Sequence, residues 1–441
     1  MPLLIEEYLE RGPATSKEIQ AVTGMSQSVV ARRLRSMGSR IVKLRSGRTL
    51  RYAVTCNAFG GDDKLPLSIV DVYGNTVPVA VIRPLAHGGF FVEASAGMPS
   101  LLFGVSNDGL YGDLPYFLFD LRPQGFLGRQ VAREMASRFD DFPPDPRNWN
   151  TNHIGRYLIS NGDDLPGNFK FGGQALLRVR RQPVIVSDRD YPDLADSVMR
   201  GVVPGSSAGG EQPKFTAFSG HSLAHVIVKF SPQEDNSITR RWRDILITEY
   251  HAAEVIRNYD FPAAETRLIE MGDRLFLESK RFDRFGEFGR KLMVSLQSVD
   301  AEFTGLGRGW LQVLDALSEQ GLIGEQDVFD VAILKQFGLL INNTDMHLGN
   351  ISLAMEGGVF RLLPLYDMCS MGFAPKSGGE LPPYNFIPSE SAISSNVARK
   401  MAHDFWERVT NDERISDELK GFLGRGNPAC LMKKRKGPVT C

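Results

Sequence analysis

Apolar residues change their spacing along this chain, and the changes predict where helices and strands lie. Residues 225–230 form a short apolar run of the length expected for a buried strand. Residues 245–256 and 328–341 carry apolar side chains at helical spacing instead. Residues 351–353 and 360–363 match two short strands, and a glycine pair between them predicts a hairpin. The chain is therefore predicted to be of the α+β class.

The first 55 residues show a self-contained pattern. Helices are predicted at 3–9, 15–22 and 28–37, and strands at 41–45 and 50–54 around a short turn. This order is typical of a winged helix-turn-helix, whose third helix lies in the major groove of DNA. Such folds also serve protein contact or dimerisation, and the pattern alone leaves these alternatives open.

Charge sets this segment apart from the rest of the chain. Residues 2–55 contain ten arginines and lysines but four glutamates, a net charge of +6, whereas the whole chain carries −1. A positive field confined to one end favours a nucleic-acid partner. Arginines on the third helix and on the predicted wing are placed to touch phosphates or guanine edges. They are Arg32, Arg33, Arg35, Arg45 and Arg48.

The stretch between residues 56 and 170 is less informative. Residues 67–83 alternate apolar and polar positions, as an antiparallel sheet would. Residues 115–123 are predicted as a strand-like run and residues 128–135 as a helix. At the other end, the basic tail 429–441 is predicted to be disordered.

Composition narrows the class of protein. A chain of 441 residues can hold two or three domains with their own cores. No apolar run reaches the roughly 18 residues of a membrane span, and the first residues lack the features of a signal peptide. The four cysteines have neither zinc-site nor disulfide spacing, which predicts free thiols. We therefore expect a cytoplasmic protein without a membrane partner, and a homodimer is no more than a general prior.

A polar loop follows the helix predicted at 328–341 and carries side chains suited to phosphoryl transfer. Asp345 and Asn350 lie five residues apart, and Asp367 follows on the next apolar stretch. Phosphoryl transfer needs a carboxylate that orients the attacking hydroxyl, with an amide oxygen and a second carboxylate that bind magnesium. The spacing of Asp345 and Asn350 equals that in the catalytic loop of protein kinases. The alternative is an ordinary surface loop, because turns favour Asn and Asp.

Upstream of this loop, three features follow one another in the order that a kinase nucleotide site uses. The first is a segment of small residues whose backbone N–H groups can approach phosphate oxygens. It contains Ser206, Ser207, Gly209 and Gly210, and Lys214 follows it. Lys229 in the predicted strand and Glu249 near the start of the predicted helix then match the lysine–glutamate pair that fixes the α and β phosphates of ATP. Each feature alone also occurs in ordinary turns and at solvated strand ends.

These stretches together resemble the HipA-like serine/threonine kinases of bacterial toxin–antitoxin systems, and most closely their YjjJ-type members with an N-terminal winged helix domain. The resemblance covers roughly residues 60–425. Its motifs are a phosphate loop at Ser206-Ser-Ala-Gly209, the signature Arg281-Phe-Asp-Arg284, the catalytic loop Asp345-Met-His347-Leu-Gly-Asn350, the pair Tyr366-Asp367, and the segment Gly162-Asp-Asp-Leu-Pro-Gly-Asn168.

The resemblance implies a role for each of these site residues. Lys229 is expected to contact the phosphates of ATP, and Asp345 to act as the catalytic base. Asn350 and Asp367 are expected to hold Mg²⁺, with His347 beside the phosphates.

It also implies an adenine site and a means of self-inhibition. The backbone around Lys280 and Phe282 would face adenine. The family phosphorylates the serine of its own phosphate loop, which ejects the loop and switches the kinase off, and Ser206 is the matching position here.

The resemblance further divides the chain into a β-rich kinase N-lobe and a mostly helical C-lobe behind smaller N-terminal parts. The expected units are the winged helix at 1–55, a HipA N-terminal subdomain at 60–170, the kinase N-lobe with its phosphate loop at 171–282, the C-lobe with the catalytic loop at 283–428, and the tail at 429–441.

Two functions remain after this reading. The first is a protein kinase that uses ATP and Mg²⁺ to phosphorylate a serine or threonine of a protein substrate, with DNA as a second partner for autoregulation. The second is a DNA-binding transcriptional regulator whose kinase-like body senses nucleotide. Retention of Asp345 favours the kinase, because a sensor does not need a residue that orients a hydroxyl. A separate antitoxin is an open question.

Overall fold

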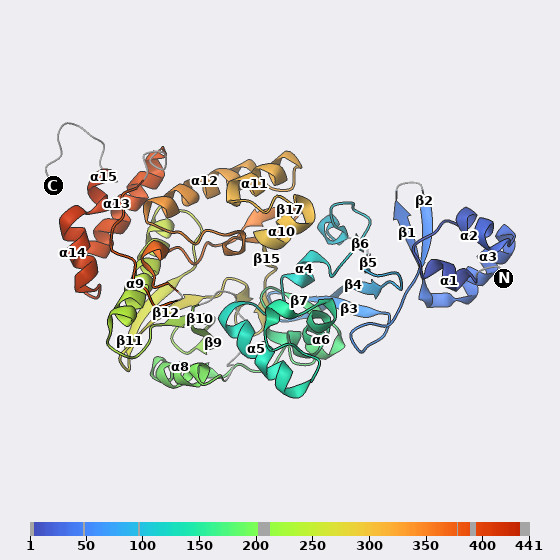
Figure 1. Ribbon diagram of the computed structural model, residues 1–441, viewed down its shortest axis with the longest axis horizontal. Helices are drawn as coiled ribbons and strands as arrows, with labels where there is room; N and C mark the ends of the chain where they lie inside the picture. Colours follow the sequence, from blue (N-terminus) through green and yellow to red (C-terminus); the bar gives the residue numbers. More distant parts are fainter. Residues whose placement is uncertain are drawn as a thin grey trace.

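The computed structural model describes residues 4–46, 49–95, 98–201, 212–376, 378–388 and 394–432, which form a mixed α+β structure. The N-terminal helices lie at one end of the molecule, and the C-terminal helices lie at the other (Figure 1). Two five-stranded sheets and a layer of helices occupy the space between them. The predicted α+β class is confirmed.

Three helices and a hairpin build the N-terminal segment. Their bounds are α1 Ile5–Leu9, α2 Ser16–Thr23, α3 Gln27–Ser36, β1 Ile41–Ser46 and β2 Thr49–Val54. Thr15 and Glu18 cap α2 reciprocally: the backbone N–H of Thr15 donates to Oε2 of Glu18 at 2.7 Å, and that of Glu18 donates to Oγ1 of Thr15 at 3.3 Å. Leu9, Ile19 and Val30 are fully buried and hold the helices together.

An antiparallel sheet with strand order β6-β5-β4-β3-β7 follows. Its strands are β3 Leu65–Val70, β4 Thr76–Pro84, β5 Phe90–Ala94, β6 Leu110–Tyr111 and β7 Phe169–Phe171, and the helices beside it are α4 Tyr116–Phe119, α5 Gly125–Arg138, α6 Thr151–Asn161 and α7 Gly173–Leu176. The strand-like run predicted at 115–123 is wrong, because α4 lies there. Tyr116, Phe117 and Leu118 are all buried, and a short apolar run cannot by itself distinguish a buried strand from a buried helix.

The second five-stranded sheet has the order β11-β12-β10-β9-β8, and only its β8–β9 pair is parallel. Its strands are β8 Ile185–Val186, β9 Lys214–Ser219, β10 Ala224–Phe230, β11 Thr266–Met271 and β12 Arg274–Lys280, and its helices are α8 Tyr191–Met199 and α9 Ser237–Asn258.

Helix α9 begins earlier than the apolar pattern predicts. Asn236 caps it by accepting a hydrogen bond from the N–H of Thr239 at 2.9 Å. Glu249 therefore lies in the middle of the helix and not near its start, so that part of the prediction is wrong. The first two turns escaped detection because their buried positions are polar, as at Arg241 and Asp244.

The rest of the chain is mostly helical. Its helices are α10 Leu296–Phe303, α11 Trp310–Glu319, α12 Glu325–Leu340, α13 Asn396–Asn411, α14 Asp417–Gly426 and α15 Pro428–Met432, and its strands are β13 Arg284–Phe285, β14 Gly289–Arg290, β15 Val294–Ser295, β16 Ser352–Glu356 and β17 Val359–Leu362. The predicted hairpin is confirmed, because β16 pairs antiparallel with β17. Short 3₁₀ helices are η1 Gly38–Arg40, η2 Ser100–Phe103, η3 Pro146–Asn148, η4 Gly162–Asp164, η5 Asp188–Asp190, η6 Leu348–Asn350 and η7 Met371–Phe373.

Two predictions for the C-terminal region need correction. The segment 429–441 is not wholly irregular, since α15 reaches Met432. Cys430 is disulfide-bonded, whereas Cys56 and Cys369 are free thiols as predicted. None of the helices described is both long and apolar enough to span a membrane.

Arg83 joins the N-terminal segment to the first sheet. Its buried guanidinium donates from Nη2 to the carbonyl oxygen of Ser39 and to Oδ2 of Asp63, both at 2.6 Å, and its Nε donates to the carbonyl oxygen of Asp63 at 2.7 Å. The N–H of Cys56 also donates to the carbonyl oxygen of Pro84 at 3.0 Å. One side chain on β4 thus fixes how the N-terminal segment sits on the sheet.

A second buried network ties the first sheet to the strands that precede α10. Asp283 accepts hydrogen bonds from the guanidinium groups of Arg281 and Arg284 and from the N–H of Gly167, the last at 2.8 Å. Arg284 also pairs with Asp164 at 2.9 Å. Burial alone would raise the pKa of Asp164, but the charges of Arg284 and its neighbours outweigh it and lower the pKa to about 2.

We expect Arg83→Met to loosen the junction at residues 55–64, because Asp63 and the carbonyl oxygen of Ser39 lose their donor. Breaking a buried ion pair from one side costs about 3 kcal/mol. Chymotrypsin should then cleave at Phe59, which packs on Phe90, faster than in the wild type. Met in place of the exposed Arg51 is the matched control, and equal cleavage rates in both variants would contradict this role of Arg83.

The Asp164 network predicts a pH dependence of stability. The pKa of Asp164 in the folded protein, about 2, lies below the ordinary value of about 3.9. Its contribution is therefore complete above pH of about 4 and lost as pH falls toward about 2. Denaturant titrations should show the gap in free energy of unfolding between wild type and Asp164→Asn narrowing over this window. An Asp62→Asn control at an exposed site should show no such trend, and a gap independent of pH would refute the prediction.

Candidate active site

The centre of the candidate site is an ion triad around Lys229. This lysine lies on β10, and its Nζ donates to both carboxylate oxygens of Glu249 on α9, at 2.7 Å to Oε2, and to Oδ1 of Asp367. The side chains of Lys229 and Glu249 are 8% and 7% exposed, whereas that of Asp367 is 30% exposed. The triad therefore presents one carboxylate toward the solvent side.

Burial and pairing set the protonation of the triad. Burial by itself would lower the pKa of Lys229, but the charges of Asp367 and Glu249 outweigh it and raise that pKa. Burial would raise the pKa of Asp367, yet Lys229 and Lys214 lower it. Burial does raise the pKa of Glu249 against the opposing charge of Lys229. A charged lysine beside an ionised Asp367 can hold phosphate oxygens and a cation at adjacent points.

Asp367 adopts a strained backbone conformation. Its φ is 57°, in the left-handed region that residues other than glycine seldom occupy. Such strain persists where the surrounding structure enforces it, and it clusters at functional sites. Here Tyr366 is fixed just before it, because its hydroxyl donates to the carbonyl oxygen of Gly349 at 2.9 Å.

The loop containing Asp345 lies against this segment. The N–H of Asp345 donates to Oδ1 of the buried Asn343 at 3.0 Å, and Nδ2 of Asn343 contacts Sδ of Met368 at 3.3 Å. The Asp345 carboxylate is 55% exposed, and Nε2 of His347 lies 4.0 Å from its Oδ1. Asp345 is thus held by its backbone while its carboxylate stays accessible to a hydroxyl from solution.

Asn350 is oriented for an oxygen ligand role. Its Nδ2 donates to the carbonyl oxygen of Asp345 at 2.6 Å, and the residue is 6% exposed. The amide nitrogen is therefore committed to the loop, which leaves the amide oxygen as the acceptor. An amide oxygen with the Asp367 carboxylate matches the hard oxygen ligands that Mg²⁺ prefers, so this donor set fits the expected metal.

Lys214 lies beside the triad on the neighbouring strand. It is the cross-strand partner of Lys229 in the β9–β10 register and is 3% exposed. Its charge lowers the pKa of Asp367 and opposes the rise in the pKa of Glu249. Lys214 was predicted only as the lysine that follows the phosphate loop, and its nucleotide-binding role stays a prediction.

Lys280 is the last residue of β12, an inner strand of the same sheet, and Phe282 follows just beyond it. The N–H of Lys280 donates to the carbonyl oxygen of Glu265 at 2.9 Å, and its Nζ pairs with the Glu265 carboxylate at 3.2 Å. The ring of Phe282 lies 5.8 Å from that of Tyr366. The end of β12, where the adenine site was predicted, therefore adjoins the Tyr366-Asp367 segment.

Several predicted residues cannot be placed. Ser206, Ser207, Gly209 and Gly210 of the phosphate loop, and Arg48 of the N-terminal hairpin, lie outside the described residues. Arg32, Arg33 and Arg35 are exposed on α3, and Arg45 is exposed on β1.

Sequence reasoning missed several residues that support the site. Nε1 of the buried Trp310 on α11 donates to the carbonyl oxygen of His347 at 2.8 Å and so fixes the loop that contains Asp345. Tyr366 belongs to the predicted pair Tyr366-Asp367 and Asn343 lies just before the predicted Asp345 motif, but neither was predicted to hold backbone at the site, as both do. The spacing of residues around Trp310 does not predict this contact, because α11 and the loop that contains His347 are brought together only by folding.

Comparisons with known proteins agree with this arrangement. Residues 61–180 match the family model of the middle domain of YjjJ-like toxins, and residues 206–420 match the HipA-like C-terminal domain. The chain is 33% identical over 435 residues to Toxin YjjJ of Escherichia coli (strain K12), with 94% of each chain covered.

Among solved structures, a chain of the complex of HipA, HipB and operator DNA from Shewanella oneidensis MR-1 matches with a TM-score of 0.55 and 15% identity, over 83% of this chain and 95% of that one. At this identity the likeness concerns the fold. The two family models and the full-length relative together lead to one conclusion: this chain belongs to the family of YjjJ-like toxins with a HipA-like C-terminal domain.

Proposed function

We propose that this protein is a serine/threonine-protein kinase that transfers the γ-phosphate of ATP, with Mg²⁺, to a protein hydroxyl. The observation that carries the proposal is the Lys229–Glu249–Asp367 triad next to the loop with Asp345 and Asn350. Lys229, with Lys214 beside it, holds phosphate oxygens, and Glu249 keeps Lys229 in place. Asn350 and Asp367 are the residues that would hold magnesium, which neutralises charge on the phosphates when bound.

Asp345 has the role of orienting the attacking hydroxyl and accepting its proton. Its exposed carboxylate can reach a side chain of another protein, and its backbone is fixed by Asn343. Ser206 is the second acceptor that we propose, because the resemblance to HipA-like kinases assigns self-phosphorylation to this position. By the same resemblance, phosphorylation of Ser206 would eject the phosphate loop and switch the kinase off.

A DNA-binding role is the second part of the proposal. Helices α1–α3 and the β1–β2 hairpin have the order of a winged helix-turn-helix, and α3 carries three exposed arginines. The HipA chain with the matching fold was solved with HipB and its operator DNA. We propose that residues 5–54 supply the DNA contact within this chain, for autoregulation. The competing function, a nucleotide-sensing DNA-binding regulator, would need the same arginines but not Asp345.

We expect Asp345→Asn to lower phosphate transfer from labelled ATP by about 100-fold or more, because positioned acid–base catalysis contributes about 10²–10⁴ in rate. The affinity for Mg²⁺–ATP should stay within about twofold of the wild-type value, since Asp345 holds no phosphate. Glu325→Gln, at an exposed site on α12, serves as the control.

The residue labelled in the wild-type protein should be Ser206, and Ser206→Ala should remove that label. Wild-type protein that binds Mg²⁺–ATP but transfers no phosphate to itself or to casein would favour the sensor.

We expect Arg33→Ala on α3 to weaken DNA binding and to lower the slope of log affinity against log salt by about 1, because one phosphate contact is lost. Arg11→Ala, also in the N-terminal segment and exposed, should leave that slope unchanged. Fluorescence anisotropy with duplex DNA at several salt concentrations measures both values. Equal slopes in all three proteins would mean that α3 does not face the DNA backbone.

A further inference from the structure

Helix α9 carries a second row of buried functional groups besides Glu249. Arg241, Asp244, Thr248 and His251 are each at most 8% exposed. Their spacing of three and four residues places them on one face of the helix. At about 100° of rotation per residue, Glu249 lies on a different face. One face of α9 therefore carries Glu249 toward the candidate nucleotide site. The other face contacts segments from the C-terminal part of the chain.

The partners of the first half of this row lie after Asp367. Nη1 of Arg241 donates to the carbonyl oxygens of Phe373 at 3.0 Å and Pro382 at 2.7 Å, and its guanidinium lies 3.7 Å from the centroid of the Tyr384 ring. Asp244 accepts hydrogen bonds from the hydroxyl of Tyr384 and from the N–H of Ser416, the latter at 2.8 Å.

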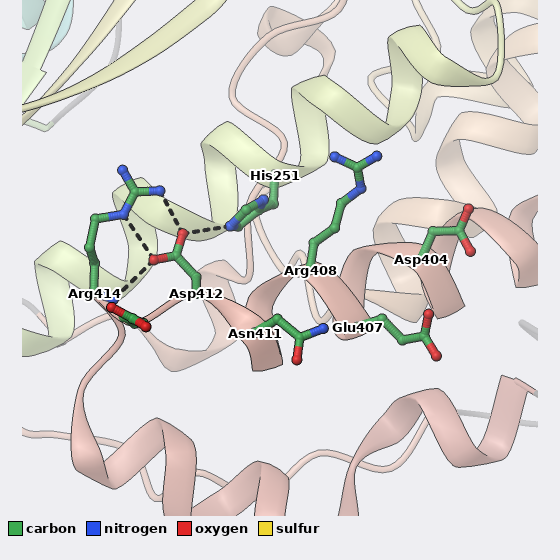
Figure 2. A pocket seen from close by; sticks show the side chains of 8 residues that line it. His251, Asp404, Glu407, Arg408, Asn411, Asp412 and Arg414 are labelled. Atoms are coloured by element: carbon green, nitrogen blue, oxygen red, sulfur yellow. Dashed lines mark hydrogen bonds and ion pairs between the residues drawn. The ribbon is translucent and has the colours of Figure 1, made fainter.

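The second half of the row repeats the arrangement. Oγ1 of Thr248 accepts a hydrogen bond from the N–H of Ser370 at 3.2 Å. Nε2 of His251 lies 2.8 Å from Oδ2 of Asp412, which also pairs with Arg414 at 2.6 Å (Figure 2). A pocket of about 790 Å³ lies there. In Figure 2, His251 on α9 lines one side of this pocket, and Arg408 and Asn411 at the end of α13 line the other.

These contacts share a topological consequence. Apart from the bond that the Thr248 hydroxyl donates to the carbonyl oxygen of Ile245 within α9, the partners named above belong to residues 370–384 or 412–416, which follow Asp367 in the chain. A buried polar group without its partner costs about 1–3 kcal/mol, and more if it is charged. Rotating or sliding α9 far enough to separate Glu249 from Lys229 would leave several such groups unpaired at once. The C-terminal part of the chain thus determines where Glu249 stands.

We propose that Arg241, Asp244 and His251 are positioning residues that hold Glu249 against Lys229 and so preset the phosphate-binding lysine; we name this set the α9 clamp. The inference rests on the proposed function, because it assigns the clamp to nucleotide binding by that site. It assigns the positioning of α9 to the two segments 370–384 and 412–416. The clamp residues act through Glu249 and touch no reacting atom.

A double-mutant cycle tests the clamp. Arg241→Leu should weaken the binding of a fluorescent Mg²⁺–ATP analogue by about tenfold in the otherwise wild-type protein. In a Glu249→Gln background the same change should have less than a twofold effect, because the clamp has no carboxylate left to position. Arg243→Leu is the matched control, since Arg243 lies on the same helix but pairs with Glu270 at 2.8 Å.

The outcomes separate the two proposals. Equal weakening by Arg241→Leu in both backgrounds would overturn the clamp, because a general loss of structure does not depend on Glu249. Wild-type protein that fails to bind the analogue would overturn the proposed function and the clamp with it. If Arg241→Leu does not fold, Tyr384→Phe gives the same cycle with a milder change, as it removes one hydroxyl from Asp244. Thermal midpoints of all variants report their folding.

Discussion

The ion triad of Lys229, Glu249 and Asp367 is the interaction on which the candidate site depends. Its three members come from β10, from the middle of α9 and from the segment after β17. A buried lysine would lose its charge without partners, so the two carboxylates maintain the cation that a phosphate needs. In turn, the lysine lowers the pKa of Asp367 and opposes the rise that burial causes in the pKa of Glu249. Each element of the triad is therefore useful only when the other two elements are in place.

Buried charged groups also hold three other junctions between segments of this chain. Arg83 joins the N-terminal segment to the first sheet, Asp283 joins that sheet to the strands before α10, and the α9 clamp joins α9 to the C-terminal helices. In each case a buried charged group bonds to backbone or side chains of a distant segment. Apolar contacts would hold these junctions with many similar packings, whereas a paired buried charge tolerates few alternative arrangements. We regard this as the reason the site residues, which come from far apart in sequence, reach a common point.

Membership in the family of YjjJ-like toxins and the geometry of the site support each other. The family relationship by itself does not say which side chains meet, and the geometry by itself does not say what the protein does in a cell. Together they support the proposed kinase, whose candidate nucleotide site lies between the second sheet and the loop that contains Asp345. The exposed carboxylate of Asp345, beside a buried and charged triad, is the part of the geometry that a nucleotide sensor would not require.

The sequence by itself determined the elements whose signals are local. The strand ending near Lys229, the helix before Asp345 and the hairpin of β16 and β17 follow from the period of apolar residues, and the order of the charged residues indicated the site chemistry. The tertiary structure alone decided that α9 begins at Ser237, that residues 116–119 form a helix, and that Trp310 and Arg241 support the site. The physical reason is that a polar residue is predicted from sequence to be exposed. It is buried only where folding brings its hydrogen-bonding partner close from a distant segment.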